Sequence, residues 1–199
     1  MIKKAIILAA GFGKRLNPLT LKCPKPLLKI GNETLLSNTL KFLEKLEIKE
    51  VVINVHYLGN QIIDYLNKKN FNFKIHILEE KKEILDTGGG ILNAIKYFHK
   101  DPFLTINPDT LWNIDYIEEL KKMEKKLEFK KKGKCIMLVV NKDKSFDKNF
   151  KGDFNFNNNL LKKEVKNNFL YIGCQILNRD LFNEHKVSNF SVSEIWRKL

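Results

Sequence analysis

The sequence contains few cysteines, few arginines and no long apolar run. The three cysteines, Cys23, Cys135 and Cys174, have neither the Cys-x-x-Cys spacing of a zinc site nor the density of a disulfide framework. No apolar stretch reaches the roughly 18 residues that a membrane-spanning helix needs. These absences argue against a disulfide-rich secreted domain, a zinc-stabilised domain and a membrane-spanning protein. They make the cytoplasm the expected compartment.

Two familiar phosphate-binding patterns are also missing. The Walker A pattern, Gly-x-x-x-x-Gly-Lys-Ser/Thr, occurs nowhere in the chain. The dinucleotide fingerprint Gly-x-Gly-x-x-Gly fails because Leu16 stands where its third glycine is required. A phosphate site in this chain must therefore be built in another way.

The excess of positive charge is large but scattered. Lysine and arginine outnumber aspartate and glutamate by 36 to 23, which gives a formal net charge of +13. A nucleic-acid-binding protein concentrates its cations on one face, with aromatic side chains between them. Here the densest run, residues 121–134, mixes lysines with Glu124 and Glu128, as on a solvated helix face. We therefore expect no specific nucleic-acid site, although the overall field favours anionic ligands.

The segment from Ile6 to Leu27 carries most of the functional information. An apolar strand runs into a turn at Gly11 and Gly13, where the missing Cβ atoms permit a close approach of the backbone to a ligand. Consecutive N–H groups in such a turn form a cradle for anions. Arg15, one of three arginines in the chain, adds a planar fork of donors, and Lys25 stands between two prolines that restrict its backbone. The order of these parts predicts a phosphate-binding site.

Apolar periodicity predicts an α/β fold with a mainly parallel, Rossmann-like sheet and helices on both faces. Strands are expected at residues 2–10, 50–55, 73–78, 103–107 and 135–141, and helices at 34–46, 59–67, 89–98 and 114–126. Ligands of such sheets bind at the carboxyl ends of the strands. Because Gly11, Thr87 and Asp109 follow strands or lie near strand ends, we expect them to converge on one edge of the sheet.

The pattern changes after residue 141. Alternating polar and aromatic residues around the asparagine run 157–159 predict a small β-hairpin insertion. Residues 169–177 follow as a return strand, and 191–199 as a final helix. No linker or repeat divides the chain, so residues 1–199 are expected to form one domain.

The block at residues 8–27 resembles the signature of the sugar-nucleotide pyrophosphorylases, which are nucleoside triphosphate:sugar-1-phosphate nucleotidyltransferases. Their pattern is Leu-Ala-Ala-Gly-x-Gly-x-Arg, then Pro-x-Thr and Pro-Lys-Pro-Leu, and every position is filled here. Residues 52–62, 85–91, 102–109, 152–154 and 171–174 resemble later segments of the family. Thr-Gly-Gly-Gly-Ile and Gly-Asp-Phe point to its N-acetylmuramate 1-phosphate uridylyltransferase branch. The resemblance implies the nucleotide-diphospho-sugar transferase fold.

The resemblance also implies a reaction. A sugar 1-phosphate oxygen attacks the α-phosphorus of a nucleoside triphosphate, expected to be UTP, and pyrophosphate leaves. N-acetylmuramate 1-phosphate is the expected acceptor, with other sugars and bases open. No general base is required, because the second pKa of a phosphate monoester is about 6. Positioning and charge neutralisation are then the main sources of catalysis.

Site residues are carried over from the family by position. Nucleotide binding falls to Leu8, Ala10, Gly11, Phe12, Gly13, Lys25, Thr87, Gly88 and Asn107. Sugar binding falls to Asn107, Gly152 and Asp153, and Mg²⁺ binding to Asp109. In catalysis, Arg15 would neutralise the leaving pyrophosphate, and Lys25 would hold the α-phosphate together with the incoming oxygen.

Several of these residues have a second interpretation that the sequence leaves open. Asp109 follows Asn107 and Pro108, and the sequence Asn-Pro-Asp also favours a turn, so Asp109 can be a turn-forming residue instead. Thr87 can simply cap a helix, although three following glycines exceed what a cap needs and would allow close approach to a flat base. Glu79 and Glu80 either contact the base edge or face solvent, Asp115 either assists the metal or caps a helix, and His56 is either structural or near the sugar.

Two departures from the family pattern qualify the assignment. Pro108 stands where the family usually has glycine. The late Trp-x-Asp-Val/Ile-Gly-Thr segment, whose aspartate is the second metal ligand, has no counterpart up to Leu199. The alternative to an active enzyme is therefore a catalytically impaired, nucleotide-binding regulatory homologue. Oligomeric state is not predicted.

Overall fold

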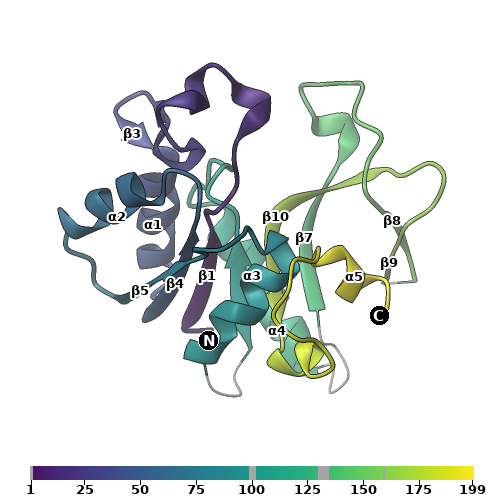
Figure 1. Ribbon diagram of the computed structural model, residues 1–199. Helices are drawn as coiled ribbons and strands as arrows, with labels where there is room; N and C mark the ends of the chain where they lie inside the picture. Colours follow the sequence, from purple (N-terminus) through teal and green to yellow (C-terminus); the bar gives the residue numbers. More distant parts are fainter. Residues whose placement is uncertain (1, 99–101, 130–134, 159) are drawn as a thin grey trace.

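A six-stranded sheet forms the centre of the computed structural model, which describes residues 2–98, 102–129, 135–158 and 160–199 (Figure 1). The strands are β1 (Lys4–Leu8), β4 (Glu50–Val55), β5 (Lys74–Glu79), β6 (Phe103–Ile106), β7 (Cys135–Asn141) and β10 (Phe169–Leu177). Their spatial order is β5-β4-β1-β6-β10-β7. β1 pairs in parallel with β4 and β6, and β4 with β5, whereas β10 is antiparallel to both β6 and β7. The prediction of a mainly parallel sheet is confirmed.

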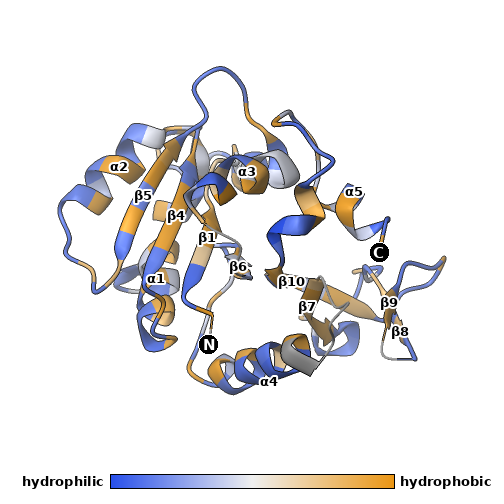
Figure 2. Ribbon diagram, turned by 90° about the horizontal axis from the view of Figure 1, so that it is seen from below, coloured by the Kyte–Doolittle hydropathy of each residue, from blue (hydrophilic) through white to orange (hydrophobic). Residues whose placement is uncertain are grey.

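Alternating side chains of each strand feed two separate cores. In β1, Ala5 and Ile7 belong to one core and Ile6 to the other, because successive side chains point to opposite faces. The first core is covered by α1 (Leu35–Lys45), α2 (Gly59–Asn67) and α4 (Tyr116–Phe129). The second is covered by α3 (Asp86–Ala94) and by the short α5 (Ser193–Trp196). Figure 2 shows α3 on one side of the sheet and α1 and α4 on the other.

Local sequence explains why α1 forms where it does. Thr34 precedes the helix in an extended conformation, and its hydroxyl oxygen accepts a hydrogen bond from the Ser37 N–H at 3.0 Å. Leu36, Leu40 and Leu43 follow at helical spacing and are buried. Each such burial contributes roughly 2 kcal/mol. In the described part of the chain, no helix combines the length and apolar content that crossing a bilayer demands.

The segment after β7 contains the predicted hairpin, as β8 (Asn155–Asn157) and β9 (Leu160–Lys162). Asn158 begins the turn with φ 49°, a conformation that asparagine tolerates, and Asn159 lies outside the described residues, as do Lys130–Lys132 and Lys134 of the lysine run. A second small hairpin, β2 (Lys29–Ile30) with β3 (Glu33–Thr34), was not predicted.

Helix boundaries differ from expectation at three places. α3 begins at Asp86 and ends at Ala94, so the Thr87–Gly90 run lies inside the helix and not in a loop before it. The last helix is confined to Ser193–Trp196, and α4 runs from Tyr116 to Phe129. Because α3 starts earlier than expected, Gly88, Gly89 and Gly90 are helical residues.

Candidate active site

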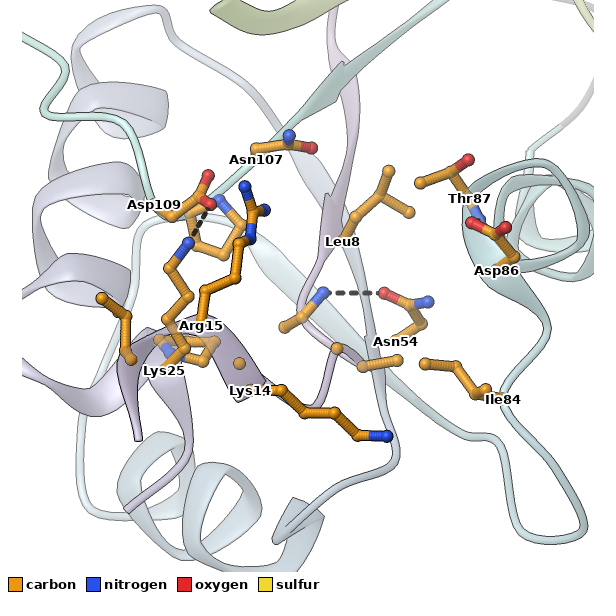
Figure 3. A pocket seen from close by; sticks show the side chains of 17 residues that line it. Leu8, Lys14, Arg15, Lys25, Asn54, Ile84, Asp86, Thr87, Asn107 and Asp109 are labelled. Carbon is orange, nitrogen blue, oxygen red and sulfur yellow. Dashed lines mark hydrogen bonds and ion pairs between the residues drawn. The ribbon is translucent and has the colours of Figure 1, made fainter. Parts of the chain in front are cut away.

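A cavity of about 370 Å³ lies at the carboxyl ends of β1 and β6 (Figure 3). Its lining comprises Leu8, Ala9, Ala10, Gly11, Gly13, Lys14, Arg15, Leu16, Lys25, Pro26, Asn54, Ile84, Asp86, Thr87, Asn107, Pro108 and Asp109. Of the residues carried over from the family, all but Phe12, Gly88, Gly152 and Asp153 therefore line one cavity. Gly13 and Lys25 of the amino-terminal loop share it with Asp109, which is distant in sequence.

One wall is the signature loop, residues 11–27, which is built from three short 3₁₀ turns. Gly13 has φ 66°, and a Cβ there would lie 2.9 Å from the Thr20 methyl group, so both backbone and packing require glycine. A Cβ on Gly11 would have no protein atom within 4 Å. The loop is thus closed on itself at Gly13 and open to the cavity at Gly11.

Two cations and one carboxylate meet on this side of the cavity. The Lys25 ammonium lies 2.5 Å from Asp109 Oδ2, and both side chains are partly exposed. Arg15 points toward the same carboxylate in Figure 3. Its guanidinium has no hydrogen-bond or ion-pair partner among the residues that the structure describes, so its donors are available to a ligand. The local excess of positive charge suits an anion.

Lys14, which was not among the residues predicted from the sequence, also lines the cavity. Its ammonium lies 5.1 Å from the centre of the Phe12 ring. That ring packs edge-on against His56, with centroids 5.6 Å apart, and does not line the cavity. His56 Nδ1 lies 2.6 Å from the Glu80 carbonyl oxygen and must donate to it. Phe12 and His56 therefore support the loop from behind.

Asn107 is held in place by a bulge in the neighbouring strand. Its N–H donates to the Gly173 carbonyl at 2.8 Å, where the register of β10 against β7 shifts between Tyr171 and Gln175. Gly173 has φ 83°, and a Cβ there would lie 2.8 Å from the Asn107 Cβ. The indole N–H of Trp112 donates to the Asn107 carbonyl at 3.1 Å. Bulges often aim side chains at sites in this way.

The opposite wall consists of residues 84–87, called here the 84–87 wall. Ile84, Asp86 and Thr87 line the cavity from this side. Asp86 has φ 56°, and its own carboxylate accepts from the Thr87 N–H at 2.5 Å, a local bond that favours this conformation for aspartate.

The glycine run that follows is not open to the cavity. Gly88, Gly89 and Gly90 are buried, and a Cβ on Gly89 would lie 1.9 Å from the Ser188 carbonyl oxygen. Protein atoms therefore fill the space that a side chain on Gly89 would take. A contact of Gly88 with the nucleotide stays a prediction.

A buried polar network joins the two walls beneath the cavity. Asn54 accepts from the Ala9 N–H at 2.9 Å and donates to Glu80 at 2.7 Å, and Glu80 accepts from the Leu85 N–H at 2.8 Å. Asn54 and Glu80 are each 3% exposed. Glu80 thus neither faces solvent nor reaches the cavity. The network joins three segments that are distant in sequence, around Ala9, Asn54 and Glu80, so local patterns could not predict it.

The predicted sugar residues lie apart from this cavity. Asp153 accepts from the Tyr171 N–H at 2.9 Å, and Gly152, with φ 73°, packs against the Asn167 carbonyl. Both sit beside β10, next to the isolated bridge between Phe154 and Phe169. Asp115 is exposed just before α4 and is not among the lining residues. The sugar-binding role of Gly152 and Asp153 stays a prediction.

The described residues contain no group of three or more histidine, cysteine, aspartate or glutamate side chains able to hold a metal ion. Mg²⁺ does not require such a group, because it is commonly held by one or two carboxylates together with substrate phosphates and water. Asp109, a carboxylate at a strand end beside free cationic donors, fits that mode of binding. Asp86, the other carboxylate of the cavity, stands on the opposite wall.

Comparison with known proteins places this geometry in context. The family model described as nucleotidyl transferase matches residues 4–151. N-acetylmuramate alpha-1-phosphate uridylyltransferase of Neisseria meningitidis is 40% identical over 114 residues, which cover 57% of this chain and 49% of the relative. D-glycero-alpha-D-manno-heptose 1-phosphate guanylyltransferase of Campylobacter jejuni is 31% identical over 198 residues, covering 96% of this chain and 83% of the relative. The chain spans about half the length of the first curated relatives that it matches.

Solved structures share the fold. HddC from Yersinia pseudotuberculosis, complexed with GMP-PN, superposes with a TM-score of 0.75 at 26% identity over 96% of this chain and 83% of its own. A UDP-glucose pyrophosphorylase complexed with UDP-glucose gives a TM-score of 0.78 at 21% identity, over 100% of this chain and 86% of its own. The fold, the complete signature at residues 8–27 and a family match over more than half of the sequence lead to one conclusion: the chain belongs to the nucleotidyl transferase family.

Proposed function

We propose that this chain transfers a nucleoside monophosphate from a nucleoside triphosphate to a sugar 1-phosphate and releases pyrophosphate. The observation that carries the proposal is the convergence of Arg15, Lys25 and Asp109 on one cavity at the sheet edge, beside the open backbone at Gly11. Relatives of similar sequence are named for this type of reaction, with UTP-dependent and GTP-dependent names among them.

The two sides of the cavity suit the two ends of a nucleotide. Arg15 and Lys25 lie on the side of the signature loop, as Figure 3 shows. Leu8 lies between them and Thr87 of the 84–87 wall. A triphosphate would extend along the signature loop, where backbone N–H groups and cations are available. The flat base would then lie between Leu8 and the 84–87 wall, on side chains that provide apolar surface.

Lys25 and Arg15 would act by charge and position. The acceptor phosphate is already ionised near neutral pH, so no side chain needs to remove a proton. Lys25 would exchange its ion pair with Asp109 for contacts to the α-phosphate and the incoming oxygen. Arg15, whose donors are free in the structure described, would stabilise the charge on the departing pyrophosphate. The prolines on both sides of Lys25 reduce the ordering cost of its placement.

Nucleotidyl transferases of this family generally use divalent metal ions. We propose Asp109 as the residue that would hold Mg²⁺, with triphosphate oxygens and water as further ligands. The bound ion would neutralise charge on the phosphates. Once Lys25 turned to the phosphates, the Asp109 carboxylate would be available to the ion.

For the substrates, we propose UTP and N-acetylmuramate 1-phosphate, acting in the cytoplasm. Support comes from the Thr-Gly-Gly-Gly-Ile and Gly-Asp-Phe segments and from the 40% identical uridylyltransferase. The guanylyltransferase relative, which covers more of the chain, makes GTP with a heptose 1-phosphate the alternative to be tested beside it. Asn107, Gly152 and Asp153 are the proposed sugar contacts.

The test is a matrix of five nucleoside triphosphates against N-acetylmuramate, heptose, glucose and mannose 1-phosphates, with released pyrophosphate as the readout. We expect the highest kcat/KM for UTP with N-acetylmuramate 1-phosphate. A preference for another pair would overturn the proposed substrates and keep the proposed reaction. An absence of turnover with every pair would overturn the reaction itself.

One observation favours a second candidate, a nucleotide-binding regulatory homologue. Within the described parts of the chain, Asp109 belongs to no group of three or more histidine, cysteine, aspartate or glutamate side chains able to hold a metal ion. Calorimetry with each nucleoside triphosphate and Mg²⁺ separates the two candidates. Binding without pyrophosphate release from any pair would support the regulatory function.

A further inference from the structure

The wall opposite the phosphate side is fastened to a distant part of the chain. We infer that residues 188–192, called here the strap, position the 84–87 wall for the nucleotide, with Asn189 as a positioning residue. The inference rests on the proposed function, because it assigns a role toward the nucleotide in that same cavity. It concerns residues that neither line the cavity nor belong to the signature.

Three hydrogen bonds connect the strap to three residues of the wall. The Asn189 amide donates to the Ile84 carbonyl at 2.6 Å. The Phe190 N–H donates to the Leu85 carbonyl at 3.2 Å. The Val192 N–H donates to the Thr87 hydroxyl oxygen at 2.9 Å. Loops rarely hold one shape without such bonds, and here they fix both the backbone and one side chain of the wall.

The strap also occupies the amino end of α3. The Phe190 carbonyl accepts from the Gly88 N–H at 2.9 Å and from the Gly89 N–H at 3.2 Å. These are the first-turn donors that a helix leaves unpaired and that often bind phosphate. Because the strap has already paired them, α3 offers them to no anion. The triphosphate is left to the signature loop, and the 84–87 wall is left to the base.

The glycine run explains how the strap can come so close. A Cβ on Gly88 would lie 2.4 Å from the Phe190 ring, and a Cβ on Gly89 would lie 1.9 Å from the Ser188 carbonyl oxygen. Any side chain at either position would displace the strap. Phe190 is 8% exposed and its ring stacks on His185 at 5.2 Å, so the strap itself is packed on both sides.

The far end of the same segment is anchored to β10, on the same face of the sheet as α3. In α5, the Trp196 indole N–H donates to Gln175 at 2.8 Å. The indole packs edge-on against Tyr171 and Phe154, with centroids 5.2 and 5.8 Å away. Tyr171 in turn donates its N–H to Asp153, a proposed sugar contact. The strap is therefore tied to β10 and holds the wall at a fixed place relative to the sheet.

The test uses three variants of the full chain and measures UTP binding by calorimetry, KM for UTP and melting temperature. Asn189→Asp keeps the shape of the side chain but sets a carboxylate against the Ile84 carbonyl. Asn189→Ala removes the donor alone. Asn189 is exposed, so neither change disturbs a core. We expect the dissociation constant for UTP to rise about threefold to tenfold in Asn189→Asp and less in Asn189→Ala, the size expected for one lost hydrogen bond.

Val192→Ala is the matched control within the strap. It removes a side chain that is 5% exposed but keeps the N–H that binds Thr87. We expect a lower melting temperature and a UTP dissociation constant within about twofold of the wild type. If Val192→Ala weakened UTP binding as much as Asn189→Asp, the strap would matter only for stability and the inference would be overturned.

A readout without ligand separates this inference from the proposed function. We expect amide hydrogen exchange at Leu85, Gly88 and Gly89 to accelerate in Asn189→Asp and to stay near wild type elsewhere in the sheet. If the wild type binds no nucleotide, the proposed function fails, and the strap loses the nucleotide role with it while its hold on the wall is still measured. If UTP binds normally to Asn189→Asp, the positioning role is wrong although the proposed function stands.

Discussion

The cavity is bordered by two glycine-containing segments that use glycine in opposite ways. At Gly11 a Cβ would have no protein atom within 4 Å, so the missing side chain leaves room for a ligand. At Gly89 a Cβ would lie 1.9 Å from the Ser188 carbonyl, so the missing side chain leaves room for the protein itself. Both segments follow strands and both belong to the family pattern. Their glycines look alike in the sequence and differ in what they contact.

The charged groups follow the same division. The signature-loop side holds Lys25, Arg15 and Lys14, whose donors are exposed or partly exposed. The 84–87 wall holds apolar and hydroxyl groups with one carboxylate, and its backbone is bound to the strap and to Glu80. The signature-loop side therefore presents groups that can bind a ligand, whereas the backbone of the 84–87 wall is held by hydrogen bonds within the protein. Substitutions in the first should reduce binding or turnover, and those behind the second should reduce stability as well.

The largest effect is expected from the charged pair of the signature-loop side. Lys25→Ala and Asp109→Ala should each lower kcat by about two to three orders of magnitude, the cost of losing one preorganised charge at a reacting phosphate. Pyrophosphate release under saturating substrates measures this. Both side chains are partly exposed, so the melting temperature should stay within a few degrees of the wild type.

Lys22→Ala is the control for these two variants. Lys22 lies in the same loop, is exposed and does not line the cavity. The rate of pyrophosphate release by Lys22→Ala should equal that of the wild type. Near-normal rates in Lys25→Ala or Asp109→Ala would remove the corresponding role and leave the cavity without its proposed chemistry.

The next effect tests the contrast between the two kinds of glycine. Gly89→Ala forces a methyl group into the strap and should lower the free energy of unfolding by about 3 kcal/mol, as overpacking of a core does. Gly11→Ala should leave that free energy nearly unchanged, because the new methyl group meets no protein atom. It should instead weaken nucleotide binding. Urea unfolding and calorimetry on both variants measure the two quantities.

Equal loss of stability in Gly11→Ala and Gly89→Ala would contradict the contrast. So would undiminished nucleotide binding in Gly11→Ala, since the open side of that glycine would then face no ligand.

Local patterns predicted the parts of the molecule that are built from neighbouring residues. The bounds of β4, α2, β7 and β10 agree with the sequence-based prediction. The signature loop was also predictable, because the residues from Gly11 to Lys25 that face the cavity are close in sequence. Their role in phosphate binding can be predicted without knowing which strands pair with β1.

Contacts between distant segments were not predictable. Asn189 binds a residue 105 positions away, and the Asn54–Glu80 bond joins β4 to the residue that follows β5. The start of α3 was misplaced for the same reason. Each glycine in a helix costs about 1 kcal/mol relative to alanine, so the glycine run favoured a helix that starts only at Gly89, but contacts with the strap override that local preference.

A smaller effect is expected beneath the 84–87 wall. Glu80 accepts two hydrogen bonds, from Asn54 and from the Leu85 N–H, and is 3% exposed. Glu80→Gln has one acceptor oxygen for these two donors, so one buried donor loses its partner. We expect a loss of about 1–2 kcal/mol in the free energy of unfolding. The measurement is urea unfolding beside Glu79→Gln, an exposed neighbour that should unfold like the wild type.

The smallest effect concerns Lys14, the cation that extends the signature-loop side. Raising the salt from about 50 mM to about 500 mM shortens the screening length severalfold, so the KM for the nucleotide should rise several times in the wild type. Lys14→Ala should raise KM about threefold at low salt and reduce the further increase with salt, since one exposed attractive charge is gone. Measuring KM at five salt concentrations gives the slope of KM against salt for the wild type and for Lys14→Ala. Identical slopes would place Lys14 outside the path of the triphosphate, with its contact to Phe12 as its remaining role.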